Sequence, residues 1–232
     1  MNIDEFFEVS ASPHIRHEDS VSRIMWSVII ALIPAFIAAL VFFGSDALRL
    51  VSVSVGVCLF TEYGIRKARR RERTIGDGSA VITGMLLAFC VPPTLPSWMM
   101  AVGAFTAIAL GKEIFGGLGM NVFNPALIAR AVLLAAFPAA MTNWIHPDGI
   151  TTATALGMVQ QGMTQDLPAY QELFIGNVGG CIGETSALAL LCGGVFLLFR
   201  KVIRIEMPLI YIGGVFILSA FAGRDPFFEI LA

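Results

Sequence analysis

The sequence predicts an all-α, polytopic membrane protein with about seven membrane segments, and three observations lead to this fold class. Hydrophobic residues make up 56% of the 232 residues and charged residues only 14%, against about 25% charged residues in soluble domains. Apolar runs approaching the roughly 20 residues that cross a bilayer recur along the chain. Two runs are short and punctuated by Gly and Pro, as in the interrupted helices that line buried sites in membrane proteins. The composition indicates an integral membrane protein rather than a soluble domain.

Seven apolar runs are expected to form the membrane segments. Pro34 is an expected kink in the first, Pro92 and Pro93 end the third, and Pro125 opens the fifth as a favoured first helical residue. The expected segments cover residues 24–44, 47–64, 79–91, 97–115, 125–140, 182–199 and 208–222.

Basic residues set the expected orientation, because Lys and Arg near span ends stay on the cytoplasmic side. With the N-terminus inside, twelve of the fifteen basic residues fall inside, including the run at 66–73; Arg49 and Arg224 fall outside and Arg130 lies within a span. We interpret the basic run as a signal for membrane orientation rather than for nucleic-acid binding, since the net charge is −2. The loop at 141–178 has no Lys or Arg and is expected to be extracytoplasmic.

The order of these segments suggests two related halves. The sequence GDGSA (76–80) opens the third span and GETSA (183–187) opens the sixth, while GMNVFNPA (119–126) is loosely echoed by GRDPFF (223–228). Such echoes are typical of transporter-like internal repeats, and the second repeat is then incomplete. No cleavage site follows the first run, so no removable signal peptide is expected. The predicted parts are a cytoplasmic N-terminal segment (1–23), a first membrane repeat of about five helices (24–140), an extracytoplasmic loop (141–181) and the start of a second repeat (182–232).

The stretch DGITTATALG (148–157) places hydroxyl groups between small residues on that loop. One interpretation is a surface turn in which Asp148 forms an Asx-turn or caps a short helix starting near Ala155. The other is a modification site, with Thr154 as the acceptor and with Gly149 and Ala153 leaving the backbone accessible to a modifying enzyme. Composition alone leaves both open.

The order Asp-Gly-x-Thr-x-Ala-Thr resembles the flavinylation motif in which a flavin transferase joins the last Thr to FMN through a phosphoester. Other stretches resemble, in the same order and over essentially the whole chain, the RnfD/NqrB family of membrane flavoprotein subunits, with the start and compact size closer to RnfD. They are SPHIRHEDSVSRIMW (12–26), GDGSAVITGMLLAFCVPPTLPSW (76–98), GKEIFGGLGMNVFNPALIARA (111–131) and GRDPFFEIL (223–231). Thr152 stands where the family more often has Gly or Ser, and relatives run to about ten spans.

The resemblance implies two flavins. Covalent FMN would be held by Thr154, and noncovalent riboflavin nearer the cytoplasm by Thr83, Asn121 and Asn124. Ordinary helix capping is the alternative role of the two asparagines, and an interfacial anchor is the alternative role of Trp144. The expected FMN surroundings are Asp148, Gly149, Thr151, Ala153 and Trp144, with Arg130 as a residue that tunes a flavin; no catalytic residue and no metal ligand is assigned.

The function implied is that of a subunit of an ion-translocating ferredoxin:NAD oxidoreductase, the Rnf complex, in the cell inner membrane. It would relay electrons through FMN and riboflavin, coupled to Na⁺ or H⁺ transport, without complete catalytic activity alone. The chain has neither a GxGxxG nucleotide motif nor a cysteine set for an iron–sulfur cluster. The expected partners are therefore membrane and peripheral subunits, including another covalent flavoprotein and iron–sulfur subunits, with a flavin transferase, membrane lipid and no nucleic acid.

The sequence is also compatible with two alternative functions. One is that of NqrB in the Na⁺-translocating NADH:quinone reductase, and the other is that of a channel or transporter subunit without a redox role, because a fold does not determine function. Glu62 and Glu113 are expected to lie exposed at cytoplasmic span ends and are candidates for ion handling. The four cysteines (58, 90, 181 and 192) are interpreted as packing residues.

Overall fold

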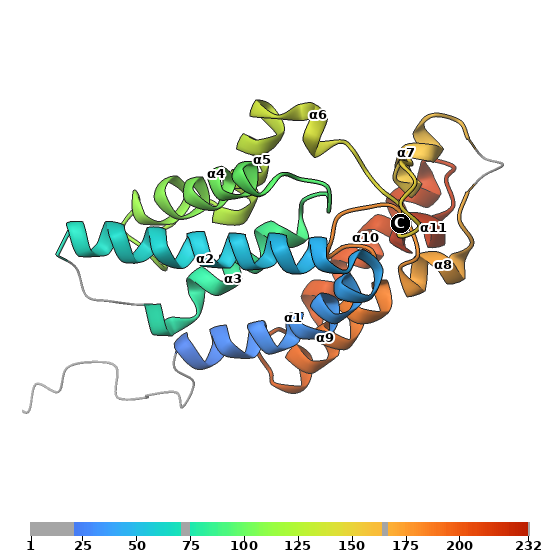
Figure 1. Ribbon diagram of the computed structural model, residues 1–232. Helices are drawn as coiled ribbons and strands as arrows, with labels where there is room; N and C mark the ends of the chain where they lie inside the picture. The colour runs from blue at the N-terminus through green and yellow to red at the C-terminus, as the bar shows by residue number, and fades with distance from the viewer. Residues whose placement is uncertain (1–20, 71–74, 164–166, 232) are drawn as a thin grey trace, which may run out of the picture.

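Helices dominate the part of the chain that the computed structural model describes, residues 21–70, 75–163 and 167–231. These residues contain no strand, only an isolated bridge between Ile145 and Thr151. Figure 1 shows α1 to α5 gathered on one side and the short helices α7, α8 and α11 on the other. The all-α fold class is confirmed; the predicted N-terminal segment up to residue 20, and Arg71 and Arg73 of the basic run, lie outside the described residues.

The seven expected segments correspond to α1, α2, α3, α4 with its continuation η3, α5 with α6, α9 and α10; the fifth, expected to be continuous over 125–140, is broken at Phe137, before Pro138. The helices are α1 (Val21–Phe43), α2 (Ser45–Ala68), η2 (Ile75–Asp77), α3 (Ser79–Phe89), α4 (Ser97–Ile108), η3 (Ala109–Glu113), α5 (Pro125–Ala136), α6 (Pro138–Met141), α7 (Ala155–Gln160), α8 (Tyr170–Ile175), α9 (Ala187–Phe199), α10 (Glu206–Phe221) and α11 (Pro226–Leu231).

Among the described residues, α1 and α2 are the two helices long and apolar enough to cross a membrane. With 23 and 24 residues and a rise of about 1.5 Å per residue, each exceeds the roughly 30 Å of bilayer hydrocarbon. The α1 helix continues through Pro34. At the turn into α2, Gly44 has φ 55°, a backbone conformation that glycine adopts without a steric penalty.

The short third and fourth segments have local causes in the sequence. The α3 helix ends at Phe89, just before Val91-Pro92-Pro93, because proline lacks the N–H that would continue the helix. The helical backbone continues beyond Ile108, the last α-helical residue of α4. Residues 109–113 form a π-turn, in which Ile114 donates its N–H to the Ala109 carbonyl at 3.0 Å. Such π-turns inside helices are frequent at functional sites.

Small residues let the helices of the bundle approach closely. The α2 helix packs between α3 and α4, and α5 packs on α4. A Cβ added at Gly84 of α3 would lie 2.7 Å from the Val55 Cα atom of α2. A Cβ added at Gly103 of α4 would lie 2.6 Å from the Leu133 Cδ1 atom of α5. Small residues at such crossings are typical of membrane helix packing.

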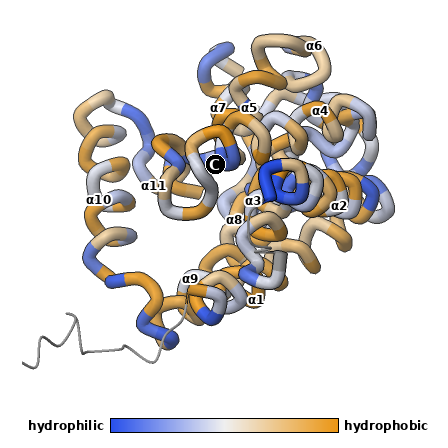
Figure 2. Tube along the Cα trace, turned by 90° about the vertical axis from the view of Figure 1, so that its left-hand side faces the viewer, coloured by the Kyte–Doolittle hydropathy of each residue, from blue (hydrophilic) through white to orange (hydrophobic). Residues whose placement is uncertain are grey.

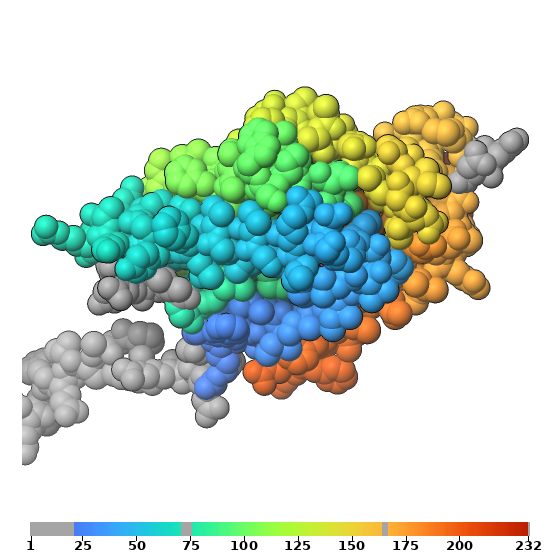
Figure 3. Space-filling model, viewed as in Figure 1, coloured from blue at the N-terminus to red at the C-terminus, as the bar shows by residue number. Residues whose placement is uncertain are grey.

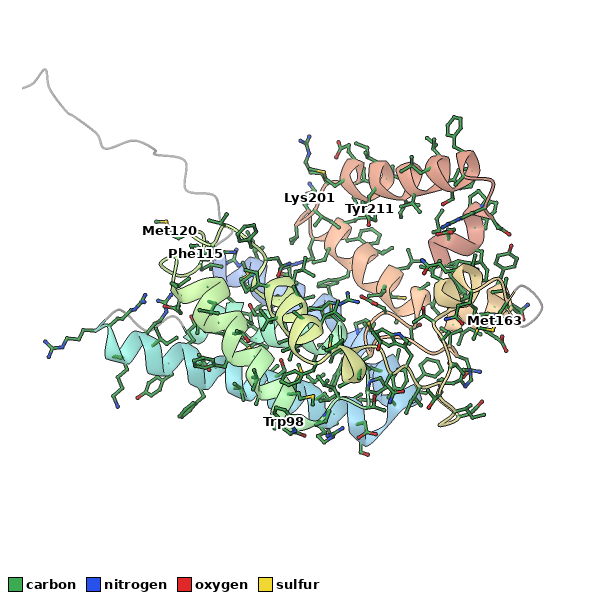
Figure 4. The ribbon with its side chains drawn as sticks, turned by 90° about the horizontal axis from the view of Figure 1, so that it is seen from above. Trp98, Phe115, Met120, Met163, Lys201 and Tyr211 are labelled. Atoms are coloured by element: carbon green, nitrogen blue, oxygen red, sulfur yellow. The ribbon has the colours of Figure 1, made fainter. Side chains whose placement is uncertain are left out.

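The segment after α5 forms a packed cap on the end of the bundle. The Trp98 ring at the start of α4 meets the Phe137 ring edge-on, with centroids 5.2 Å apart, and Figure 4 places Trp98 at the end of the bundle away from Phe115 and Met120. Figure 3 shows the segment following α6 packed against α2. Ala155, Leu173 and Phe228 form a second small core that ties α7, α8 and α11 together.

The predicted sixth span starts later than expected. Residues 182–186 form a turn held against the end of α3, where Ile182 and Gly183 donate their N–H groups to the carbonyls of Val91 and Phe89, both at 3.1 Å. Ser186 then caps α9 by accepting from the Ala189 N–H. The predicted start of the helix at Ile182 was therefore wrong by five residues, because hydrogen bonds to α3 replace the first helical turn.

The last helices are partly separate from the bundle. The α9 helix packs on α1, and α10 packs on α11, so that α10 stands apart with a largely apolar trace (Figure 2). Asp225 accepts the N–H groups of Phe227 and Phe228 at the start of α11, as Asn124 accepts from Ala126 at the start of α5. The echo between GMNVFNPA and GRDPFF thus has the same local geometry, a capping side chain before a proline-led helix.

Candidate functional site

A cavity of about 420 Å³ lies at the end of the bundle where α3 and α5 begin. We call it the bundle cavity. Thr83, Asn121 and Asn124, predicted from the resemblance to hold riboflavin, all line it. Met25 of α1 and Lys112 of η3 line other parts of the wall, so four elements of the bundle contribute to it. The structure brings the three predicted residues together.

The polar side chains of the bundle cavity are held by local hydrogen bonds. The Asn124 Oδ1 atom accepts from the Ala126 N–H at 3.0 Å, so the capping role is present. The Asn121 Nδ2 atom donates to the Phe123 carbonyl at 3.0 Å, and the Thr83 hydroxyl donates to the Ser79 carbonyl at 2.9 Å. Since the cap uses only the oxygen of Asn124, its NH₂ group remains a donor for a ligand. The Asn121 oxygen is likewise an acceptor, so the wall offers complementary amide edges.

Two glutamates predicted to be exposed are instead buried next to this cavity. Glu62 and Glu113 are each 0% exposed, and Lys112 is 2% exposed. The Lys112 Nζ atom lies 2.9 Å from Glu62 Oε1, and the Arg66 Nε atom lies 3.0 Å from Glu113 Oε1. The expected exposure was wrong because both glutamates lie within helices that pack together, where ion pairing offsets the loss of hydration.

The four charged residues form one connected group. Arg66 Nε is also 3.4 Å from Glu62 Oε1, which links the two ion pairs. The π-turn in η3 places the consecutive residues Lys112 and Glu113 against α2. Two basic and two acidic side chains give the group no net formal charge, which is the arrangement that buried charges require.

A second cavity, of about 250 Å³, lies on the opposite side of α5, toward the segment after α6. We call it the loop cavity. Arg130, Trp144 and Thr154 line it together with Cys181 and Glu184. Thr154 and Trp144, predicted to form the FMN site, and Arg130, predicted to tune a flavin, therefore line one cavity. All three side chains are half-buried.

The hydroxyl stretch begins as a hairpin-like turn. His146 donates its N–H to the Ile150 carbonyl at 2.9 Å, and Thr152 donates its N–H to the Trp144 carbonyl at 3.1 Å. Gly149, at φ 84°, forms the tip, and Asp148 lies 3.1 Å from the His146 Nδ1 atom. The turn therefore places Trp144 beside the polypeptide that leads to Thr154.

Thr154, not Asp148, caps the short helix that follows. Its Oγ1 atom accepts from the Gly157 N–H at 3.1 Å, at the start of α7. The suggestion that Asp148 caps this helix was wrong, since its side chain pairs with His146 and lies six residues before the cap position. The hydroxyl oxygen of Thr154 is thus fixed in orientation while it faces the loop cavity.

The remaining residues predicted around FMN are placed differently. Ala153 lines an adjoining cavity of about 320 Å³ with His146 and Thr152. This cavity and the loop cavity share Ala155, Val178 and Gly179. Asp148, Gly149 and Thr151 are exposed and line neither cavity, so the structure does not bring them to the predicted flavin position.

Arg130 connects the loop cavity to the turn before α9. Its Nη1 atom lies 3.7 Å from Glu184 Oε1, and its Nη2 atom lies 3.9 Å from the Cys181 Sγ atom. Burial raises the pKa of the Cys181 thiol, so this cysteine stays neutral beside the guanidinium. Arg130 is six residues after Asn124, about 9 Å along the helix axis at 1.5 Å per residue. The α5 helix therefore carries a wall of each cavity.

Sequence reasoning missed Lys112, Ser79 and Glu184 as cavity residues. Lys112 could have been found from its position directly after the apolar run 97–111. A charged residue next to a membrane segment has either a lipid-surface role or a buried partner. For Ser79 and Glu184 the only signal was the internal echo, which contains both residues; Ser79 opens α3, whereas Glu184 lies in the turn before α9.

Comparisons with known proteins show the family of this chain. The sequence model of the NQR2, RnfD, RnfE family matches residues 8–232. The chain belongs to this family. It is 43% identical to the D subunit of the proton-translocating ferredoxin:NAD(+) oxidoreductase complex of Clostridium ljungdahlii, over 97% of this chain and 74% of that protein.

Two further relatives carry related names. The D subunit of the Na(+)-translocating ferredoxin:NAD(+) oxidoreductase complex of Acetobacterium woodii is 46% identical over 94% of this chain and 70% of that protein. The D subunit of the ion-translocating oxidoreductase complex of Halorhodospira halophila is 34% identical over 94% of this chain and 72% of that protein. Family membership, together with the apolar helices, identifies the chain as a membrane protein.

Proposed function

We propose that this chain is the electron-carrying membrane subunit of an ion-translocating ferredoxin:NAD⁺ oxidoreductase complex, with FMN bound covalently to Thr154 and riboflavin bound in the bundle cavity. Relatives along almost its whole length are named as the D subunits of such complexes. One is named proton-translocating and the other Na⁺-translocating, so the proposal covers either ion. A single observation carries the flavin part. Thr83, Asn121 and Asn124 line one cavity, at the start of α5, and Thr154 lines a separate cavity that Arg130, in the middle of α5, and Trp144 also line.

The bundle cavity fits a noncovalent ring system. Its volume of about 420 Å³ lies within the roughly 300–1,000 Å³ of ligand pockets, which combine apolar walls with a few polar groups. Ile82, Leu86 and Phe123 supply apolar wall, and the amides of Asn121 and Asn124 supply the donor and acceptor that the edge of an isoalloxazine requires. These residues would bind and orient riboflavin.

The loop cavity fits a tethered flavin. It is smaller, at about 250 Å³, and it continues past Val178 and Gly179 into the adjoining cavity. Trp144 provides an aromatic wall for the ring, and Arg130 provides a positive charge for the phosphate or the reduced ring. The Gly157 N–H holds the Thr154 oxygen in place, so the acceptor position is defined before the phosphoester forms.

Flavins supply one- and two-electron transfer, and the protein supplies position and electrostatics. Because Pro125 and Arg130 of α5 line the two cavities, these residues would hold flavins bound there within the length of one short helix, less than the roughly 30 Å of membrane hydrocarbon. The proposed topology has the N-terminus and the bundle cavity toward the cytoplasm and the loop cavity outside. The further partners proposed are iron–sulfur and flavoprotein subunits, a flavin transferase for Thr154, and the lipid of the cell inner membrane.

The test is a maturation experiment. The chain is produced in the membrane with and without a flavin transferase, denatured, separated and examined for flavin fluorescence, and the peptide that contains Thr154 is weighed. We expect a fluorescent band and a mass increment of one FMN, minus water, on that peptide only when the transferase is present. An unmodified peptide in both samples contradicts the covalent site and favours a channel or transporter subunit without a redox role.

A further inference from the structure

Lys112 is a buried cation in the wall of the bundle cavity. It lies in the π-turn of η3, is 2% exposed and lines the cavity beside Thr83, Asn121 and Asn124. The Nζ atom donates to Glu62 Oε1 at 2.9 Å and to Ser79 Oγ at 2.6 Å. Both partners lie in the packed helices α2 and α3, so the ammonium group has a fixed place.

The hydrogen bonds around Ser79 fix the direction of this contact. The Ser79 hydroxyl donates to Asp77 Oδ1 at 2.6 Å, and the same Asp77 oxygen accepts the Ser79 N–H at 2.8 Å. Because a hydroxyl has one donor, Ser79 can only accept from Lys112. The two successive hydrogen bonds, from Lys112 to Ser79 and from Ser79 to Asp77, therefore orient the ammonium group toward the start of α3.

One donor of the ammonium group is left for the cavity. A lysine ammonium has three N–H donors, and two of them are used by Glu62 and Ser79 in the part of the chain that the structure describes. The remaining N–H belongs to the Lys112 side chain, which lines the cavity and is only 2% exposed. A buried donor without a protein partner is costly, so an acceptor on a bound ligand would stabilise it.

We infer that Lys112 is a ligand-binding residue of the bundle cavity that donates to an acceptor on the bound ring system and favours its reduced, anionic form over its oxidised form. This inference rests on the proposed binding of riboflavin in that cavity. Two electrons from a redox partner in the complex, taken up with one proton, leave a flavin ring with one negative charge. An ammonium group in hydrogen-bonding contact then binds the reduced ring more tightly than the neutral oxidised ring.

The surrounding charges explain why this effect requires Lys112 itself. Glu62, Arg66 and Glu113 are bound to one another or to Lys112 through the contacts at 2.9–3.4 Å, and none of the three lines the cavity. Among the described residues that line the cavity, Lys112 is the one with a positively charged side chain. A change of Lys112 also removes the partner of Glu62, so its effect must be separated from that of a broken buried ion pair.

The experiment compares three variants of the chain within the purified complex. Glu62→Gln removes the acidic partner and keeps Lys112, while Lys112→Met combined with Glu62→Gln removes both charges of this ion pair. Lys67→Met removes an exposed lysine that lies over the Tyr63 ring and serves as the matched control. For each complex, the noncovalent flavin is extracted and counted, the FMN on the Thr154 peptide is measured, and the midpoint potential of the noncovalent flavin is determined by redox titration.

We expect Lys112→Met with Glu62→Gln to weaken binding of the reduced flavin about tenfold relative to the oxidised flavin. This corresponds to a potential about 30 mV more negative for a two-electron couple. Glu62→Gln alone should not lower the potential, because Lys112 then lacks its counter-charge, and Lys67→Met should leave it unchanged. The FMN on Thr154 should be the same in all samples.

Each result has a defined consequence. If the double variant keeps its riboflavin at the wild-type potential, the inference about Lys112 is wrong and the proposed function stands. If the wild-type complex contains no noncovalent flavin, the proposed role of the bundle cavity is wrong and the inference about Lys112 is wrong with it. FMN on Thr154 is measured separately in the same samples.

Discussion

The bundle cavity and the loop cavity differ in how the protein builds them. Helix ends and the loop before α5 line the first, with Thr83 and Lys112 buried and Asn124 exposed. A hairpin-like turn and a glycine-rich turn form much of the second, with Trp144 and Thr154 half-buried. The first is also larger, at about 420 Å³ against about 250 Å³.

This difference explains why one flavin would be covalent and the other not. A larger cavity with several polar side chains in its wall can hold a ring system by noncovalent affinity. A smaller cavity formed largely by turns holds a ring less tightly, and a covalent tether compensates because it keeps the ligand at a high effective concentration. The comparison predicts that changes at one cavity leave the flavin at the other in place.

The largest expected effect comes from Thr154→Val, which removes the acceptor oxygen at the loop cavity. We expect complete loss of covalent FMN with riboflavin retained at the wild-type amount, and a loss of stability of about 1 kcal/mol from the missing cap. In-gel fluorescence and extraction of noncovalent flavin measure the two. Thr154→Ser, which keeps the oxygen, should retain covalent flavin. Loss of both flavins in Thr154→Val would mean that the cavities are not independent.

Gly111→Ala should produce the next largest effect, at the other cavity. A Cβ at Gly111 would lie 2.7 Å from the Pro125 Cα atom, so the start of α5 and Asn124 must move. Overpacking of this kind costs about 1–3 kcal/mol, and we expect noncovalent flavin binding to fall roughly tenfold. Gly56→Ala is the control, since nothing lies within 4 Å of its added Cβ. Equal riboflavin content in both variants would contradict the assignment of the bundle cavity.

The variant Asn124→Ser distinguishes two roles of Asn124, the helix cap made by its oxygen and the donor made by its NH₂ group. Serine caps a helix about as well as asparagine but has no NH₂ group, so stability should change little. Loss of one neutral hydrogen bond of about 0.5–1.5 kcal/mol should weaken riboflavin binding several-fold. Thermal unfolding and flavin titration of the complex test this pair of outcomes. Destabilisation without weaker binding would indicate that Asn124 acts only as a cap.

Gly157→Ala should have the smallest effect, and only on the loop cavity. Its Cβ would lie 3.0 Å from Thr154 Oγ1, which crowds the acceptor oxygen without removing it. We expect the rate of flavin transfer to fall by about two- to threefold, since a displacement of a few tenths of an ångström costs under about 1 kcal/mol. A time course with added transferase measures it, with Gly194→Ala as the control because its added Cβ meets nothing within 4 Å.

The sequence was most informative where local chemistry decides the structure. Apolar runs and the prolines at 92, 93 and 125 predicted the helices and most of their ends, because both act within a few residues. The resemblance identified Thr83, Asn121 and Asn124, which the fold brings to one cavity although Thr83 is distant in sequence. Asn124 could also be predicted as a cap from the proline that follows it.

The predictions failed where packing decides the outcome. The burial of Glu62 and Glu113 depends on a π-turn that changes the direction of the last turn of α4, and no residue pattern in 97–113 marks that turn. The cap suggested for Asp148 was wrong because the turn places its side chain beside His146, and Thr154 occupies the cap position. The late start of α9 likewise depends on carbonyls at the end of α3.

A count of flavins in the wild-type complex tests the central claim most directly. The complex, matured with its transferase, is denatured, and the flavin released into solution is separated from the flavin that stays on the chain. The account predicts one riboflavin released and one FMN retained per chain, the latter on the peptide that contains Thr154. Release of all flavin, or none of either kind, would contradict it.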